Sequence, residues 1–207
     1  SYISSLSRID QGQFVWLDKF TIRNLELLHS SNAGAKTLID VIDKTTSPMG
    51  SRLMRRWLSL PLKNKEQITA RYDIVDFFVN NNELIYTFQD AMRQVGDLER
   101  LISKVSLLRV NPRELLQVAR ALDQIELLKN LCKESESPCL QLYAEQLNVC
   151  DSIRQRIKKV LNPESPALLS KGNYINEGVD EELDSLRKLS RSGKDYLTDM
   201  QKRESAA

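Results

Sequence analysis

Apolar residues recur at helical spacing along most of this chain, and this periodicity limits its possible folds more than any other feature. Between residues 68 and 160, apolar positions fall three or four residues apart in five successive segments, as on one face of an α-helix. These positions are Ile68, Tyr72, Val75, Phe78 and Val79; Leu84, Ile85, Phe88, Ala91, Met92 and Val95; Leu98, Leu101, Ile102, Val105 and Leu108; Leu115, Val118, Leu122, Ile125, Leu128 and Cys132; and Ile153, Ile157 and Val160. The sequence therefore predicts a mainly α fold, an irregular multi-helix bundle, and disfavours a repeat solenoid because no fixed period links the segments.

Two segments indicate extended structure instead. Residues 14–17 combine aromatic and branched side chains, and we expect them to pair as short strands with the segment around Leu25 and Leu27. Residues 167–178 surround a Lys-Gly-Asn turn signal and predict a short hairpin or loop. The predicted fold therefore includes minor short strands near the N-terminus and around 167–178.

The segment from residue 180 onward predicts a long helix that leaves the bundle. Asp180, Glu181 and Glu182 stand at its start, where acidic groups suit the positive end of the helix dipole. Its apolar edge thins after Ser190, while cations become frequent. A helix whose apolar stripe fades is leaving its core, so we expect an arm that projects into solvent or toward another domain. A truncated helix without its packing partner would show the same pattern.

A further helix is predicted within residues 45–62, which carry a start and a stop signal. Thr46 or Ser47 can accept a hydrogen bond as N-cap, and Pro48 suits the first turn. Pro61 cannot continue the helix. Gly50 in the first turn favours close approach of another backbone.

Three arginines share one side of this helix, because Arg52, Arg55 and Arg56 are spaced i, i+3 and i+4. Arginines that contact DNA phosphates must be free of acidic partners. Asp40 and Asp43 lie nearby in sequence and can pair with them. The spacing therefore favours a structural, ion-paired face over direct DNA contact, without excluding the latter.

The opposite side of the same helix is apolar and includes Leu53, Trp57 and Leu60. This pattern predicts that Trp57 lies in the core. Its replacement by Ala would then cost about 3–5 kcal/mol, as for other large buried aromatic residues.

The composition excludes several classes of protein and site. The 207 residues are 28% charged, but 30 basic residues are nearly balanced by 28 acidic ones, unlike a dedicated DNA-binding domain. Cys132, Cys139 and Cys150 lack zinc-site spacing, His29 is the single histidine, and we expect reduced thiols in a reducing cytosol. No apolar run approaches the roughly 18 residues of a membrane span.

A search for catalytic motifs finds no Gly-rich phosphate loop and no nucleophile or metal-protease motif. The acidic pair Asp97 and Glu99 and the run at 180–184 are interpreted as charges at helix N-termini, not as metal ligands. Asp97 and Arg100 are spaced for a local ion pair. We therefore expect no catalytic, cofactor or metal site, and no enzyme activity in this segment.

Several long stretches, taken together and in order, closely resemble the MutS family of DNA mismatch repair. They are "LDKFTIRNLELL" (17–28), "LIDVIDKTTSPMGSRLMRRWLSLPL" (38–62), "ITARYDIVDFF" (68–78), "QVGDLERLISKV" (94–105), "NPRELLQVARAL" (111–122) and "DEELDSLRKLSRSGKDYLTDMQKRE" (180–204). One departure is Val179-Asp180, where the family commonly has Tyr-Asn.

The resemblance implies a place within that family. The chain resembles the core or lever domain, domain III, and we expect it to be an excised piece that ends before the clamp. The implied division of this single domain, 1–207, is a connector tail and linker at 1–18, a helical core at 19–165, and the start of the lever helix at 180–207. Pro48, Gly50, Trp57, Asp97 and Arg100 would be structural residues.

The implied function is non-catalytic coupling of nucleotide state to DNA clamping. ATP and Mg²⁺ would bind elsewhere in a cytoplasmic, homodimeric parent that recognises mismatched duplex DNA through other domains and works with a MutL-type partner. Lys194, Lys202 and Arg203 lie toward the DNA-gripping end and are candidate phosphate contacts. A free-standing helical interaction scaffold, a MutS relative that does not act on mismatches, and an enzyme with an unrecognised site remain alternatives.

Overall fold

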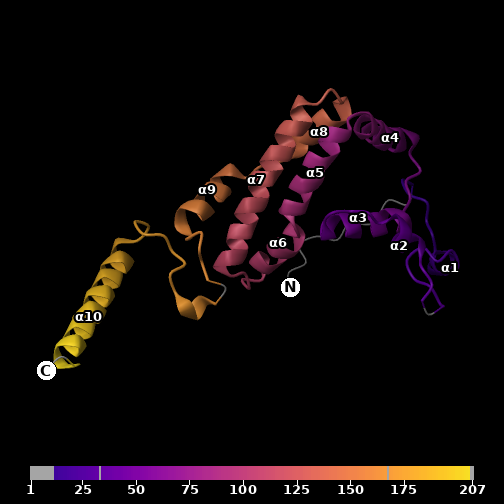
Figure 1. The fold of residues 1–207 in the computed structure, drawn as a ribbon. Helices are drawn as coiled ribbons and strands as arrows, with labels where there is room; N and C mark the ends of the chain where they lie inside the picture. The colour runs from indigo at the N-terminus through magenta and orange to yellow at the C-terminus, as the bar shows by residue number, and fades with distance from the viewer. Residues whose placement is uncertain (1–11, 33, 167, 206–207) are drawn as a thin grey trace.

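The structure is a computed structural model that describes residues 12–32, 34–166 and 168–205, and these are mainly helical (Figure 1). The helices are α1 (Lys19–Asn24), α2 (Leu38–Ile42), α3 (Pro48–Ser59), α4 (Lys65–Asn80), α5 (Asn82–Val95), α6 (Leu98–Ser106), α7 (Pro112–Glu134), α8 (Pro138–Gln146), α9 (Asp151–Val160) and α10 (Glu181–Ser205), with a 3₁₀ turn η1 at Leu169–Lys171. The predicted mainly α fold is confirmed.

Helix α7 is the centre of the bundle, since it contacts α5, α6, α8 and α9. Figure 1 shows α5 and α7 side by side along most of their length. Ala91 and Val95 of α5 pack with Ala121 and Leu128 of α7 in one buried cluster. Small side chains at this interface let two helices approach closely, so the contact depends on shape as well as on apolar area.

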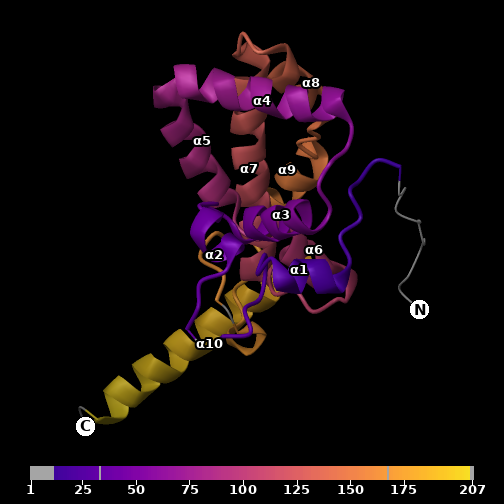
Figure 2. The ribbon, with the colours of Figure 1, turned by 90° about the vertical axis from the view of Figure 1, so that its right-hand side faces the viewer.

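A second buried cluster joins α4 and α8 to the far end of α7. Cys132, Leu140 and Ala144 form its buried part, and aromatic side chains of α4 and α5 pack against them. Phe78 meets Phe88 edge to face with ring centroids 4.9 Å apart, a favoured aromatic geometry. Figure 2 shows α4 lying across the ends of α5 and α7, where this cluster holds it.

The start signals in the sequence are used as predicted. The Ser47 hydroxyl accepts the backbone N–H of Gly50 at 3.1 Å, and Pro48 begins α3. At α7, Asn111 accepts the N–H of Glu114 at 2.8 Å, while Glu114 accepts the N–H of Asn111 at 3.1 Å. This reciprocal pair is a capping box, which satisfies two backbone donors at the helix start.

The extended segments form less structure than the sequence predicts. Within the described residues they contribute two isolated bridges, Phe14 with Leu62 and Leu161 with Ile175. Phe14 pairs with the chain that follows α3 and not with the segment around Leu25, because Leu25 ends α1. The pairing partner of Phe14 is therefore distant in sequence, and no local sequence pattern predicts it.

Trp57 does not lie in the core, contrary to the prediction. Its side chain is 40% exposed, and Leu53 beside it is also exposed. The Arg71 guanidinium lies 3.6 Å from the centre of the Trp57 ring, so a cation–π contact joins α3 to α4. The periodicity of α3 is real, but its apolar side is only partly covered by the described residues.

Helix α4 follows the predicted orientation only in part, since Ile68 and Phe78 of the predicted stripe are partly buried. Tyr72, Val75 and Val79 are exposed, whereas Phe77 and Phe78 pack inward. The two aromatic rings pack against the buried cluster of Cys132, Leu140 and Ala144. Gly50 differs too: a Cβ there would lie 3.0 Å from the Cβ of Thr45, so its contact is a side chain and not another backbone.

Helix α10 leads away from the bundle in both ribbon views, as predicted for a projecting arm (Figures 1 and 2). The Asp180 carboxylate accepts the N–H of Leu183 at 2.8 Å and so caps its start. None of the helices in the described ranges is long and apolar enough to cross a membrane.

Burial separates two substitutions that the sequence alone would treat alike. Ile39 is 1% exposed, and we expect Ile39→Ala to lower the free energy of unfolding by about 2–5 kcal/mol. For Trp57→Ala we expect about 1–3 kcal/mol, less than full burial implies, because part of the ring already faces water. Urea melts of both variants measure this. An equal or larger loss at Trp57 would place the indole inside the cooperative core.

Candidate functional site

The helices of the bundle are joined by ion pairs, and the first of them links α3 to the start of α6. Arg52 donates to Asp97 at 2.6 and 3.0 Å and to Glu99 at 2.6 and 3.0 Å. The sequence-based partners Asp40 and Asp43 were wrong for this arginine. The two acids that replace them lie about 45 residues away in sequence, so no local spacing indicates the pair.

Asp97 has two roles at this joint. It accepts from Arg52, and it also caps α6 by accepting the backbone N–H of Arg100 at 3.3 Å. The hydrogen bond from Arg52 is the main reason that the pKa of Asp97 lies below its ordinary value. The predicted local ion pair between Asp97 and Arg100 is replaced by this backbone contact, since the described ion pairs of Asp97 involve Arg52 alone.

Asp40 and Asp43 accept hydrogen bonds from residues close to them in sequence. Hydrogen bonds from Thr37 lower the pKa of Asp40, and a hydrogen bond from the Ser51 hydroxyl is the main cause of the lowered pKa of Asp43. The positive charge of Arg55 favours both carboxylates more weakly. Arg55 itself is exposed and, within the described residues, makes no ion pair.

The second joint holds α9 against α7. The Arg154 side chain is only 12% exposed and meets Asp123 at 3.4 Å, Asp151 at 2.6 Å, and Glu126. Lys158 adds a contact to Asp123 at 2.6 Å. Hydrogen bonds to Glu126 and Asp151 raise the pKa of Arg154 above its ordinary value.

The third joint lies at the base of α10. The Asn176 side-chain amide donates to the carbonyls of Lys159 at 2.9 Å and Leu161 at 3.0 Å, which fastens the connecting loop to the end of α9. Arg187 of α10 then donates to the Ile175 carbonyl of the same loop at 3.0 Å. Asp184 accepts the Gly178 N–H at 2.6 Å, closing the turn that precedes the helix.

These contacts define how α10 is attached. In the described part of the chain α10 makes no extended packing with another helix. Its direction is set by the base joint, formed by Asn176, Asp184 and Arg187. Sequence reasoning missed all three residues. Asp184 and Arg187 show the i, i+3 spacing of a helical ion pair, whereas nothing local distinguishes Asn176.

An apolar hollow of about 530 Å³ opens between the helices, with Trp57 and Arg71 among its lining residues. The other side chains that line it come mainly from α4, α5, α7 and α8. Because Met49 and Trp57 of α3 face this hollow, the apolar side of α3 is only half covered.

The residues predicted to contact nucleic acid cannot be placed relative to these joints. Lys194, Lys202 and Arg203 lie on α10, and their side chains fall outside what the structure describes. Cys132 is buried, and burial raises the pKa of its thiol. The described residues contain no cluster of His, Cys, Asp or Glu that could hold a metal.

The family model for domain III of MutS matches residues 20–206. This chain belongs to the MutS family, as its domain III. It is 48% identical over 204 residues to the DNA mismatch repair protein MutS of Bacteroides fragilis, 47% to that of Flavobacterium johnsoniae and 49% to that of Parabacteroides distasonis.

Each of these alignments covers 99% of the chain but only 23–24% of the relative. The chain therefore spans about a quarter of the length of the MutS proteins it matches. The predicted membership of the MutS core domain is confirmed, and the joints described above belong to a MutS domain III.

The two roles of Asp97 can be separated by substitution. Asp97→Asn keeps an N-cap but loses the charge, so it should lower the urea midpoint less than Asp97→Ala does. In an Arg52→Ala background, Asp97→Asn should change the midpoint little further, because its ionic partner is gone. Equal effects of Asn and Ala would mean that Asp97 serves the ion pair alone.

The effect of Asp97 should also depend on pH with a definite sign. Its folded pKa is lowered, so as pH falls the unfolded chain takes up the proton first, near the ordinary value of 3.8. The stabilisation is therefore complete above that value and is lost as pH falls through the folded pKa. The midpoint difference between wild type and Asp97→Asn should shrink over this acidic range.

Proposed function

We propose that this chain is the non-catalytic core and lever module of a mismatch-recognition ATPase, and that it couples nucleotide state to the grip on DNA. The division that we propose is a connector tail and linker at 1–18, a helical core at 19–165, and the start of a lever helix at 180–207. Residues 1–11 of the tail lie outside the described structure. Membership of MutS domain III supports the proposal.

The observation that carries the proposal is the way α10 is rooted. A long helix held by hydrogen bonds and an ion pair at one end transmits a rotation of its base as a displacement of its far end. Arg187, Asp184 and Asn176 connect that base to α9, and Arg154 connects α9 to α7. A continuous set of contacts therefore runs from the centre of the bundle to α10.

We assign nucleotide binding, DNA binding and partner binding to other parts of the full-length parent protein. We propose that ATP and Mg²⁺ bind there, that other domains hold mismatched duplex DNA, and that the parent forms a homodimer and works with a MutL-type partner in the cytoplasm. The name that these relatives share, DNA mismatch repair protein MutS, favours mismatch repair over a relative with another DNA substrate.

The base joint gives a direct test in a full-length MutS that carries this segment. In the Arg187→Ala variant, ATP and mismatched DNA should each still bind when added alone. The factor by which one ligand changes the affinity for the other should fall several-fold, since such factors are typically about 5 to 150. Arg191→Ala is the matched control on the same helix, because its ion pair to Glu177 is exposed. Equal coupling in wild type and Arg187→Ala would contradict the lever role of this joint.

The proposed phosphate contacts on α10 are testable by salt dependence. Replacing Lys194, Lys202 and Arg203 together by Ala should reduce the slope of log affinity against log salt, by about 0.9 for each phosphate that the protein no longer neutralises. Arg55→Ala with Arg56→Ala is the control, for which we expect a nearly unchanged slope. If the triple variant keeps the wild-type slope, the three cations do not touch phosphate.

A further inference from the structure

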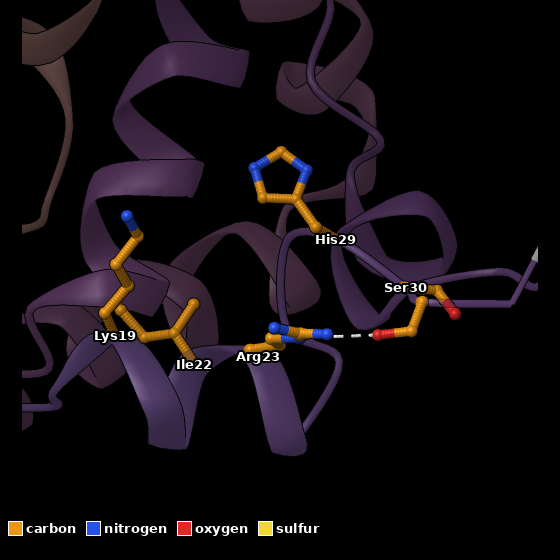
Figure 3. Close-up of a pocket in the computed structure, with 6 residues that line it drawn as sticks. Lys19, Ile22, Arg23, His29 and Ser30 are labelled. Atoms are coloured by element: carbon orange, nitrogen blue, oxygen red, sulfur yellow. Dashed lines mark hydrogen bonds between the residues drawn. The ribbon is translucent and has the colours of Figure 1, made fainter.

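A hollow of about 420 Å³ beside α1 brings three basic side chains together (Figure 3). Lys19 and Arg23 lie one turn apart on α1, and His29 comes from the segment that follows the helix. Figure 3 shows these three side chains around the hollow, with Ile22 at its wall. These residues come from two segments and line one space together with Ile22, Ser30 and Ser31.

The acids nearest to this hollow in sequence are already used. Asp18 accepts the N–H of Thr21 at 2.6 Å as the cap of α1, and Glu26 accepts the Ser30 hydroxyl at 2.7 Å. No carboxylate is among the described residues that line the hollow. Lys19 has no ion-pair partner in the described structure, and neither does Arg23, so the site carries uncompensated positive charge.

The loop that completes the hollow is held in place before any ligand arrives. The N–H of Leu38 donates to the Glu26 carbonyl and that of Ile39 to the Leu27 carbonyl, both at 3.0 Å. Leu27 and Ile39 are buried, which anchors the loop to the start of α2. A preformed arrangement of donors lowers the entropy lost on binding.

The hydroxyl groups of the loop add polar contacts at the same place. Arg23 Nε donates to Ser31 Oγ at 3.4 Å, and the Ser30 hydroxyl accepts the N–H of Asn32 at 3.0 Å. The Ser30 hydroxyl already donates to Glu26, so the guanidinium, ammonium, imidazole and Ser31 hydroxyl groups are the donors left for phosphate oxygens.

A second hollow of about 350 Å³ shares Arg23 and Ser31 with the first and is also lined by Phe20, Asn24 and Glu26, whose carboxylate accepts the Ser30 hydroxyl. Phe20 is 73% exposed, so its ring is open to contact. An exposed ring beside a cationic hollow offers a stacking face for a nucleobase, and an amide beside it can hydrogen-bond to the base edge.

We propose that the hollow at Lys19, Arg23 and His29 binds a phosphate group carried by a nucleotide or by a nucleic-acid strand, with the base against Phe20. The site uses side chains of α1 and the loop after it, and it lies apart from the joints that root α10. It therefore does not depend on the coupling role proposed above.

The test uses amide spectra of the 207-residue chain during titration with sodium phosphate, with sodium chloride at matched ionic strength as reference. We expect saturable shifts confined to residues 19–31. The double variant Lys19→Gln with Arg23→Gln should weaken phosphate binding about tenfold or more, since two charge-assisted hydrogen-bond donors are removed. Both side chains are exposed, so the variant should fold. Arg55→Gln with Arg56→Gln removes the same charge elsewhere and should change the affinity less than about twofold.

Two further ligands identify what carries the phosphate. Adenosine monophosphate should bind several-fold more tightly than phosphate, and Phe20→Ala should remove that advantage alone. A short single-stranded oligonucleotide that binds more tightly still would assign the phosphate to a strand, and weaker binding would assign it to a free nucleotide. Shifts that do not saturate with any of these ligands, or an equal loss in both double variants, would overturn the proposal.

Discussion

The close contact between α5 and α7 is the interaction on which the rest of the structure depends. Ala91 and Ala121 at this interface leave almost no exposed surface and allow the two helices to lie close together. Three further helices, α6, α8 and α9, also pack on α7. A larger side chain at Ala121 would therefore disturb the position of several helices and not of one alone.

Polar joints continue outward from this apolar centre. Lys104 of α6 pairs with Glu114 at the start of α7. Arg52 joins α3 to the start of α6, and Arg154 joins α9 to α7. Five arginines of the described structure are engaged with carboxylates: Arg52, Arg93, Arg154, Arg187 and Arg191. On α3 the predicted ion-paired face holds for Arg52 alone, with partners other than the predicted ones.

The sequence predicted well what is decided locally. Ser47 and Asn111 start their helices as expected, and the family resemblance placed the chain correctly because it rests on many residues in order. Contacts decided by tertiary packing escaped prediction. Trp57 has the spacing of a core residue, but whether a periodic position is covered depends on which other helix reaches it, and spacing carries no such information.

The same distinction applies to the candidate site. The i, i+3 spacing of Asp184 and Arg187 is visible in the sequence, but their bonds to the loop at 175–178 depend on where Asn176 fastens that loop. Packed apolar cores resist deformation, whereas hydrogen bonds and ion pairs at exposed positions exchange readily with water. A stiff bundle with polar joints at its edge is thus a body in which angular change is confined to few residues. In the lever role that we propose, movement at the base of α10 would reach its far end without being lost within the bundle.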